Sequence, residues 1–397
     1  MKILHTADWH LGKKLNDQID LIEVQRDLLD QIQKILEEEN IDVFVLAGDI
    51  YQTVQVSDDA TSLLNQFLKE TVRRLKNTLF ILVNGNHDPA EKLNFGSDLM
   101  VENLKIISKW NGGIHPIQIQ KNQTVYNFFV IPFLRVLEYK KIFPNKDFIK
   151  ETKDIYEDLL KSIQLNKNHK NILITHTAID FLGKQERYDS EDDTYGNVGL
   201  VPYHLFQNFD LVLLGHYHRY QKFDKNIFYS GSIYKYSVKE HNHKKGVLIH
   251  HLEENETEFK ELNLKKDVIY LQGTFQEILQ QEKRFTAEPL NQDFFYIELW
   301  DSYFIPFVKE ELSKYYKNII GITYSKIDFI DKSSFLNIHY NEIAHLSEVE
   351  LFKRFLEFTY SEKDKNQFNE ILKKKTGFRE ESLVQKFKEL WDEFLKE

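Results

Sequence analysis

Five short apolar segments in the first part of the chain are each followed at once by a cluster of polar residues. The segments are rich in branched residues and bounded by turn or charged residues, a pattern typical of buried strands in an α/β core. Because such sheets place their sites at the carboxyl ends of the strands, we expect the five clusters to meet at one edge. The five pairs are Ile3–Leu4 with Asp8-Trp9-His10, Val43–Leu46 with Gly48-Asp49, Leu79–Val83 with Gly85-Asn86-His87-Asp88, Ile172–Ile174 with His176, and Leu211–Leu214 with Gly215-His216-Tyr217-His218.

These clusters carry the donor atoms of a metal centre. The sequence has no cysteine, so any metal must be held by His, Asp, Glu or Asn. Residues two apart along an extended segment point the same way, so Asp8 with His10, and His216 with His218, can each grip one ion. The two oxygens of Asp49 could bridge two ions. This oxygen and nitrogen set suits Mn²⁺, with Zn²⁺, Fe²⁺ or Mg²⁺ as alternatives, and two such ions can clamp a phosphorus during in-line displacement.

Composition and charge narrow the class of protein. At 397 residues the chain exceeds the usual size of one core, so we expect one large domain with smaller units. The net charge of −10 argues against passive DNA coating, because proteins that hold nucleic acid mainly by its phosphates are usually basic. It leaves room for a DNA enzyme, since bound cations are large local charges. The sequence shows neither an apolar run of membrane-spanning length nor the apolar stretch of a signal peptide, which predicts a cytoplasmic protein.

The pattern of elements changes near residue 268. Before it, strand and helix signals alternate, with helices expected from about Glu23 to Glu39 and from an N-cap at Ser57. After it, a short strand–helix–strand–helix–strand run predicts a small α+β unit, and the last fifty or so residues read as charged helices. We therefore expect three parts: residues 1–265, 266–335 and 336–397. The elements expected in the small unit are Val268–Leu271, Phe275–Phe285, Phe294–Leu299, Pro306–Tyr316 and Ile319–Tyr324.

The order D-x-H, G-D, G-N-H-D, a lone His and G-H-x-H resembles the calcineurin-like metallophosphoesterase superfamily over the first 230 residues. Five clusters in order, each after a strand, form a highly specific signal, whereas any one of them alone would be weak. Longer segments resemble the bacterial SbcD nuclease family more closely. These segments are Lys2–Gly12, Ala47–Tyr51, Gly85–Asp88, Leu214–Arg219 and Tyr229–Ser232.

The resemblance implies an α/β sandwich of two central sheets flanked by helices, and it implies roles for the cluster residues. His87 would face the scissile phosphate and act on the leaving oxygen or on the transition state without binding metal. Asp88 would either orient a neighbour or cap the following turn, and the sequence leaves both open. One ion would be held by Asp8, His10, Asp49 and His218, and the other by Asp49, Asn86, His176 and His216.

The same resemblance implies a metal-dependent exonuclease and endonuclease that acts on double- and single-stranded DNA ends and hairpins in break repair. It also implies a partner, an SbcC-like ABC ATPase with a coiled coil. Archaeal and eukaryotic relatives carry a further His three residues after the bridging Asp, where this chain has Gln52. The bacterial branch also lacks that His, so we interpret Gln52 as a mark of the branch.

Two helical segments predict contacts between chains. The helix from Ser57 to Leu75 has more apolar positions than one core-facing stripe needs, which favours a homodimer, although a fully internal helix would explain it nearly as well. The final helix places Leu383, Phe387 and Trp391 on one side, which favours docking of the ATPase partner over packing on the small unit.

The sequence also leaves room for two rival functions, and two minor features have alternative explanations. A phosphatase or cyclic-nucleotide phosphodiesterase for small substrates would need only the first domain, and a non-catalytic scaffold would tend to lose ligands. His5 could support the ligands or simply pack in the core. The segment His241–Lys245 could touch DNA phosphates, but a solvated loop is the commoner explanation.

Overall fold

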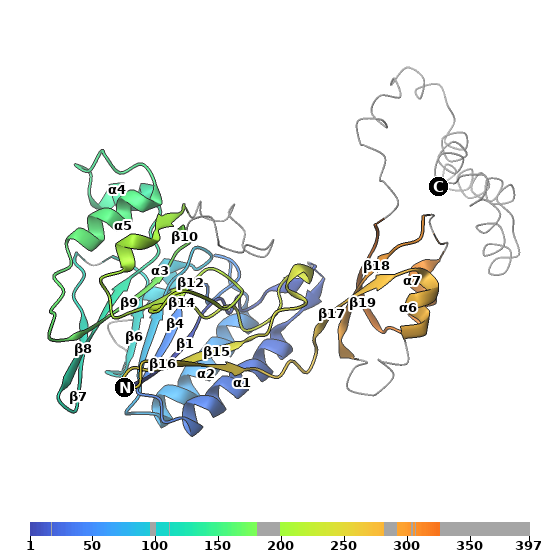
Figure 1. Ribbon diagram of the computed structural model, residues 1–397, viewed down its shortest axis with the longest axis horizontal. Helices are drawn as coiled ribbons and strands as arrows, with labels where there is room; N and C mark the ends of the chain where they lie inside the picture. Colours follow the sequence, from blue (N-terminus) through green and yellow to red (C-terminus); the bar gives the residue numbers. More distant parts are fainter. Residues whose placement is uncertain are drawn as a thin grey trace, which may run out of the picture. The chain divides into compact units, whose positions relative to one another are not determined.

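The computed structural model describes residues 1–325 except 17, 96–100, 111, 181–198, 282–291, 303–304 and 306. The chain divides into two compact units, Met1–Lys265 and Lys266–Glu397 (Figure 1). Among the described residues, no helix is long and apolar enough to cross a membrane. The expected helical segment 336–397 lies outside the described residues.

The first unit contains two mixed six-stranded sheets, and the expected sandwich of two central sheets is confirmed. In each sheet the central strands are parallel and run toward the same edge. In spatial order, the first sheet is β16 (Glu256–Glu261), β15 (Gly246–His251), β1 (Lys2–Thr6), β4 (Val43–Ala47), β5 (Leu79–Val83) and β6 (Leu104–Ile107). The second sheet is β13 (Gln221–Asp224), β14 (Ile227–Tyr229), β12 (Leu211–Gly215), β9 (Lys170–His176), β8 (Thr124–Ile131) and β7 (Ile117–Lys121).

The core of this unit lies between the two sheets. Alternate residues of β4 show how it is built: Val43 and Val45 face the second sheet, in one cluster with Phe128 and Ile172 of its strands. Phe44 points the other way, toward the helices, with its ring centroid 5.9 Å from that of Phe67. All five residues of β4 are buried, which explains the continuous apolar run in the sequence. Each buried Val, Leu and Phe side chain of β4 contributes about 1.5–3 kcal/mol by leaving water.

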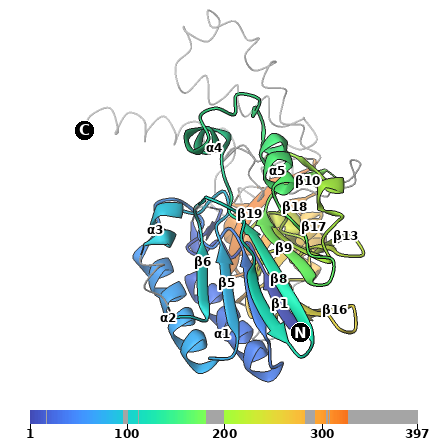
Figure 2. The same cartoon turned by 90° about the vertical axis from the view of Figure 1, so that its left-hand side faces the viewer.

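Helices α1 (Ile22–Glu38) and α2 (Asp58–Arg74) cover the outer face of the first sheet (Figure 2). Ser57 caps α2 as expected, and its hydroxyl accepts the amide N–H of Ala60 at 3.3 Å. None of the large apolar side chains of α2, a helix described in full, is exposed; Leu63 and Leu64 lie in the core. The apolar positions of α2 are thus satisfied within the chain, and the homodimer stays a prediction.

The remaining elements of the first unit are short. The outer face of the second sheet packs against α4 and α5, where Tyr139 and Leu159 join one cluster with Leu173 of β9. The short elements of the first unit are β2 (Lys14–Leu15), β3 (Ile19–Asp20), α3 (Ala90–Asn94), α4 (Val136–Ile142), α5 (Thr152–Lys161), β10 (Ile179–Asp180), β11 (Val201–Pro202) and the 3₁₀ turns η2 (Tyr203–Phe206) and η3 (Val238–Glu240).

In the second unit the described elements follow the expected strand–helix–strand–helix–strand order, and the strands form one parallel sheet. Its helix expected over Pro306–Tyr316 is shorter than predicted and spans Val308–Leu312; it begins after Phe307, which has a left-handed φ of 55°. The helix that begins at Phe275 is described only to Gln281. The parallel strands are β17 (Val268–Gly273), β18 (Phe294–Leu299) and β19 (Asn318–Tyr324), with α6 (Phe275–Gln281) and α7 (Val308–Leu312).

Two buried histidines stack across β1 and β15. The ring centroids of His5 and His250 lie 5.7 Å apart, and both side chains are buried. His5 donates from Nε2 to the carbonyl of Leu214 at 3.1 Å, so it is a packed core residue, one of the two roles left open by the sequence. Burial lowers the pKa of His5 to about 3 and holds the pKa of His250 well below its ordinary value.

This pair should make the protein sensitive to acid. Below pH about 6.5 the unfolded chain takes up protons on these histidines while the folded chain does not, so the free energy of unfolding falls as pH falls. Each histidine contributes a slope of about 1.4 kcal/mol per pH unit. We predict that His250→Phe reduces the loss of stability between pH 7.5 and 5.5 relative to the unmodified protein. Urea unfolding in the presence of a chelator measures it, and equal losses in both proteins would contradict the prediction.

Candidate metal centre

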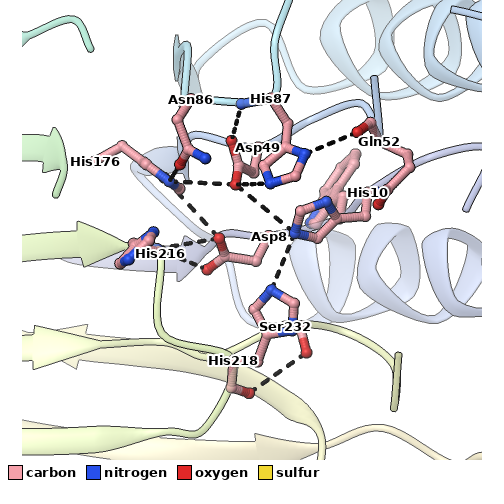
Figure 3. A network of polar contacts seen from close by, with 12 residues as sticks. Asp8, His10, Asp49, Gln52, Asn86, His87, His176, His216, His218 and Ser232 are labelled. Atoms are coloured by element: carbon pink, nitrogen blue, oxygen red, sulfur yellow. Dashed lines mark hydrogen bonds and ion pairs between the residues drawn. The ribbon is translucent and has the colours of Figure 1, made fainter. Parts of the chain in front are cut away.

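The polar clusters of the first unit meet in one buried place at the carboxyl ends of β1, β4, β5, β9 and β12 (Figure 3). Their side chains are at most 5% exposed. Within each of three sets of residues, the candidate ligand atoms lie within 4.8 Å of one another. The sets are Asp8, His10 and His218; His10, Asp49 and His87; and Asp8, Asp49 and His176.

Two imidazole nitrogens form the first half of the site. Nε2 of His10 and Nε2 of His218 are 3.0 Å apart, and Asp49 Oδ2 lies 3.7 Å from His10 Nε2. Two neutral imidazoles that face each other through bare nitrogens repel. Two nitrogens bound to one ion at about 2.1 Å lie about 3.0 Å apart when the angle at the ion is about 90°, and about 3.4 Å apart at the tetrahedral angle. The spacing therefore fits a shared cation.

The second half of the site is built around His176. Its Nε2 is 3.0 Å from Asn86 Oδ1 and 3.3 Å from Asp49 Oδ2, and its Nδ1 donates to the carbonyl of Ala47 at 2.9 Å. Burial alone would lower the pKa of His176, but the charge of Asp49 raises it to about 9. In the metal-free protein a proton therefore occupies Nε2, at the point where a cation can replace it.

Asp49 stands between the two halves. Besides its contacts to His10 and His176, its Oδ1 accepts the backbone N–H of His87 at 3.0 Å. Burial alone would raise the pKa of Asp49, but His176 and His87 hold it well below its usual range, so this carboxylate stays charged. One buried carboxylate that faces both imidazole groups supplies the geometry for a bridging ligand.

The structure places His216 differently from the other candidates. Its backbone N–H donates to both carboxylate oxygens of Asp8, each at 3.0 Å, and its ring centroid lies 5.5 Å from that of His176. It belongs to none of the three sets of converging atoms among the described residues. The backbone of His216 therefore fixes Asp8, and its side chain lies beside the second half of the site.

The loops that carry these residues are held in an unusual backbone conformation. Positive φ angles occur at Asp8 (52°), His10 (43°), Asp49 (49°) and His216 (115°). Such conformations cost free energy outside glycine and cluster at functional sites. Position 85 must be glycine to leave room for the Asp49 carboxylate, because a Cβ there would lie 2.1 Å from Asp49 Oδ1. The backbone at Gly85 therefore approaches the Asp49 carboxylate closely.

Asp88 resolves the choice left open by the sequence. Its carboxylate accepts the backbone N–H groups of Ile50 (3.1 Å), Tyr51 (2.9 Å) and Gly85 (2.8 Å). It therefore orients its neighbours by tying the loop of Asp49 to the loop of Asn86. Burial and the nearby Asp49 charge raise the pKa of Asp88 to about 6, while these hydrogen bonds oppose the shift.

Several residues near the site were not found by sequence reasoning. Gln25 of α1 donates to the carbonyls of Trp9 (3.2 Å) and His10 (2.8 Å), and Tyr236 also donates to Trp9. The solvated loop expected at His241–Lys245 is wrong for His243 and Lys245, which are 6% and 2% exposed; Lys245 pairs with the buried Glu240. Gln25 lies within a predicted helix, and its position there gives no sign of a role at the site. Lys245 lies in a charged segment between predicted elements, and such segments are usually exposed to solvent.

Comparison with known proteins assigns both parts of the chain. The family model of calcineurin-like phosphoesterases matches residues 1–220, and the model described as the type 5 capsule protein repressor C-terminal domain matches residues 265–360. The SbcD subunit of the nuclease SbcCD from Staphylococcus epidermidis (strain ATCC 12228 / FDA PCI 1200) is 34% identical over 345 residues, which cover 85% of this chain and 89% of that protein. The buried His and Asp groups are thus a divalent-metal site of the metallophosphoesterase kind.

Two solved structures are more distant. The protein TT1561 of Thermus thermophilus is 14% identical with a TM-score of 0.39, covering 66% of this chain and 99% of that one. GAP50, the anchor in the inner membrane complex of Plasmodium, is also 14% identical with a TM-score of 0.39, covering 67% and 90%. Similarity at this level adds nothing to the family assignment.

Asp49→Asn should weaken both halves of the site at once, because one carboxylate faces both. We predict that metal analysis after dialysis against Mn²⁺ finds less metal in both positions, whereas Asp210→Asn, at the opposite end of the strands, retains the full content. Asp210 suits the control because it pairs with Lys170, outside the site. Full occupancy of two positions in Asp49→Asn would show that this carboxylate is not shared.

Proposed function

We infer, because this chain belongs to the calcineurin-like phosphoesterase family and to its SbcD branch, that it is a metal-dependent DNA nuclease and the nuclease subunit of an SbcCD-type complex. The observation that carries the proposal is the convergence of buried His, Asp and Asn side chains from the carboxyl ends of five separate strands at one edge of the sandwich. Its proposed substrates are DNA ends and hairpins.

We propose two divalent ions, with Mn²⁺ as the resident metal, because the donor set mixes oxygen and nitrogen without sulfur. When bound, the two ions activate water and neutralise charge that develops on the phosphate. The chain's own part is to hold the donors at short distance in a buried place. Asp8, His10, Asp49 and His218 would hold one ion, and Asp49, Asn86, His176 and His216 the other.

His87 is proposed as the group that acts on the leaving oxygen. Its Nδ1 donates to the main-chain carbonyl of Gln52 at 2.9 Å, which fixes the ring and leaves Nε2 to act. That Nε2 lies 4.0 Å from Asp49 Oδ2, and the ring is 4.9 Å from that of His10. His87 thus borders the candidate ligands, a position that suits a group that would pass a proton to a substrate oxygen. Because Gln52 contributes its backbone, this contact does not depend on its side chain.

Cleavage of end-labelled DNA with Mn²⁺, with Mg²⁺ and with EDTA tests the activity. A nuclease cleaves DNA ends and hairpins in Mn²⁺ and is inactive in EDTA. An enzyme for small substrates would instead hydrolyse a chromogenic phosphodiester and leave the hairpin intact. A scaffold would do neither.

His87→Gln should separate chemistry from metal binding. We predict that the variant keeps both ions and still binds DNA ends, while turnover falls by about 10²–10⁴, the usual worth of a general acid. His169→Gln provides the control, since His169 contacts Asn127 and Asn166 away from the site. Loss of metal in His87→Gln would make His87 a ligand and refute the assignment.

We propose that 1–265 is the catalytic domain, that 266–335 is a capping domain for DNA recognition, and that 336–397 binds an SbcC-like ATPase. The curated relative is a subunit of a complex, which supports a partner. We also propose a homodimer that holds two DNA ends, and light scattering at micromolar concentration measures its mass.

Truncation near Asn341 should leave a Mn²⁺-dependent nuclease that no longer binds its ATPase partner, because the residues of the metal centre all precede position 220. The matched C-terminal model extends to residue 360, so a second truncation after residue 360 serves as the comparison. We predict that both truncated proteins cleave DNA and that neither is retained in a pull-down with the ATPase. Undiminished partner binding by both would show that the last residues have another role.

A further inference from the structure

An ion pair is completely buried behind His218. Glu240 ends the 3₁₀ turn η3 and Lys245 directly precedes β15; their side chains are 0% and 1% exposed. Glu240 Oε1 accepts from Nδ1 of His218 at 3.3 Å, and the other carboxylate oxygen accepts from the ammonium group of Lys245. The pair therefore contacts a candidate metal ligand directly.

Lys245 also holds the main chain of the same histidine. Its Nζ donates to the carbonyl of His218 at 2.9 Å and to Oγ of Ser232 at 2.8 Å, in addition to Glu240 (Figure 3 shows Ser232 and His218). An ammonium group has three protons, and these three acceptors match them. His218 is thus fixed twice, through its ring by Glu240 and through its backbone by Lys245.

Burying such a pair does not by itself favour folding. The loss of hydration of two charges commonly matches or exceeds their attraction, and apolar residues of similar volume are often as stable. Here the contacts have a specific effect on the ring. When Nδ1–H of His218 is donated to Glu240, the lone pair is on Nε2, and this is the nitrogen 3.0 Å from His10 Nε2.

The two halves of the site differ in this respect. In the second half, His176 Nδ1 donates to the neutral carbonyl of Ala47, whereas His218 Nδ1 donates to a carboxylate. A carboxylate behind a ligating imidazole makes it a stronger donor to metal than a carbonyl does, and removal of such a partner typically weakens metal binding 10–100-fold. The halves should therefore respond differently to changes at Glu240.

We propose that Glu240 and Lys245 are a positioning pair that sets the metal affinity of the half formed by Asp8, His10 and His218, and of that half alone. The inference rests on the two-ion site of the proposed function. Neither residue touches metal or substrate; both act through His218.

Calorimetric titration of the full-length, metal-free protein with Mn²⁺ tests the proposal. We expect two binding events in the unmodified protein and a loss of about 10–100-fold in the affinity of one of them in Glu240→Gln. Because this variant leaves Lys245 buried without its anion, the double variant Glu240→Gln/Lys245→Met is measured beside it. It should show the same selective loss with restored thermal stability. Lys244→Met is the matched control, since this exposed neighbour pairs with Glu261 and should leave both affinities unchanged.

The outcomes separate this inference from the proposed function. Native affinity for both ions in the double variant would overturn the inference, and so would equal weakening of both, which would indicate a general effect on the fold. Cleavage of DNA by the unmodified protein, measured in parallel, decides the proposed function independently. If DNA is not cleaved but Glu240→Gln weakens one of two Mn²⁺ sites, the positioning role stands and the nuclease proposal fails.

Discussion

The first unit depends on the interaction of the buried, charged Asp49 carboxylate with the imidazoles around it. A carboxylate without water is costly unless positive charge and hydrogen-bond donors surround it. The His87 amide and the ring of His176 supply them in the metal-free protein. These groups come from loops after different strands, so the charge can be accommodated only when both sheets are in place. The site can therefore form only when the two sheets are packed together.

The layers around the site follow from this requirement. Strand β4 is buried on both faces, which fixes the starting point of the Asp49 loop within the core. Asp88 then ties that loop to the next one, and Gln25 of α1 ties the loop of His10 to the helix layer. The loops of Asp49, Asn86 and His10 are thus held by hydrogen bonds from side chains that are not candidate ligands. Such support keeps donors in place before an ion arrives.

The sequence predicts the strands and the polar clusters well because both have local signals. A strand buried on both faces, such as Val43–Leu46, is a continuous apolar run in the sequence. The polar residues of the site follow such runs directly along the chain, as Gly48 and Asp49 do here. Long-range pairing has no such signal. Glu240 and Lys245 look like solvated charges until β15 brings them behind His218, and Phe307 shows its left-handed backbone only in three dimensions. The burial of α2 is likewise decided by its neighbours, since an apolar stripe does not say whether its cover is the same chain or another.

The left-handed backbone of Asp8, His10 and Asp49 has a consequence for how such a protein can change over generations. Residues in this conformation are less stable than glycine there, so the unliganded fold gains stability by losing them. Under selection for heat resistance alone, these residues would be replaced, and the protein would become more stable but inactive. Persistence of the strained residues therefore requires continuing selection for activity, and engineering for robustness would have to hold these positions fixed and seek its gains elsewhere.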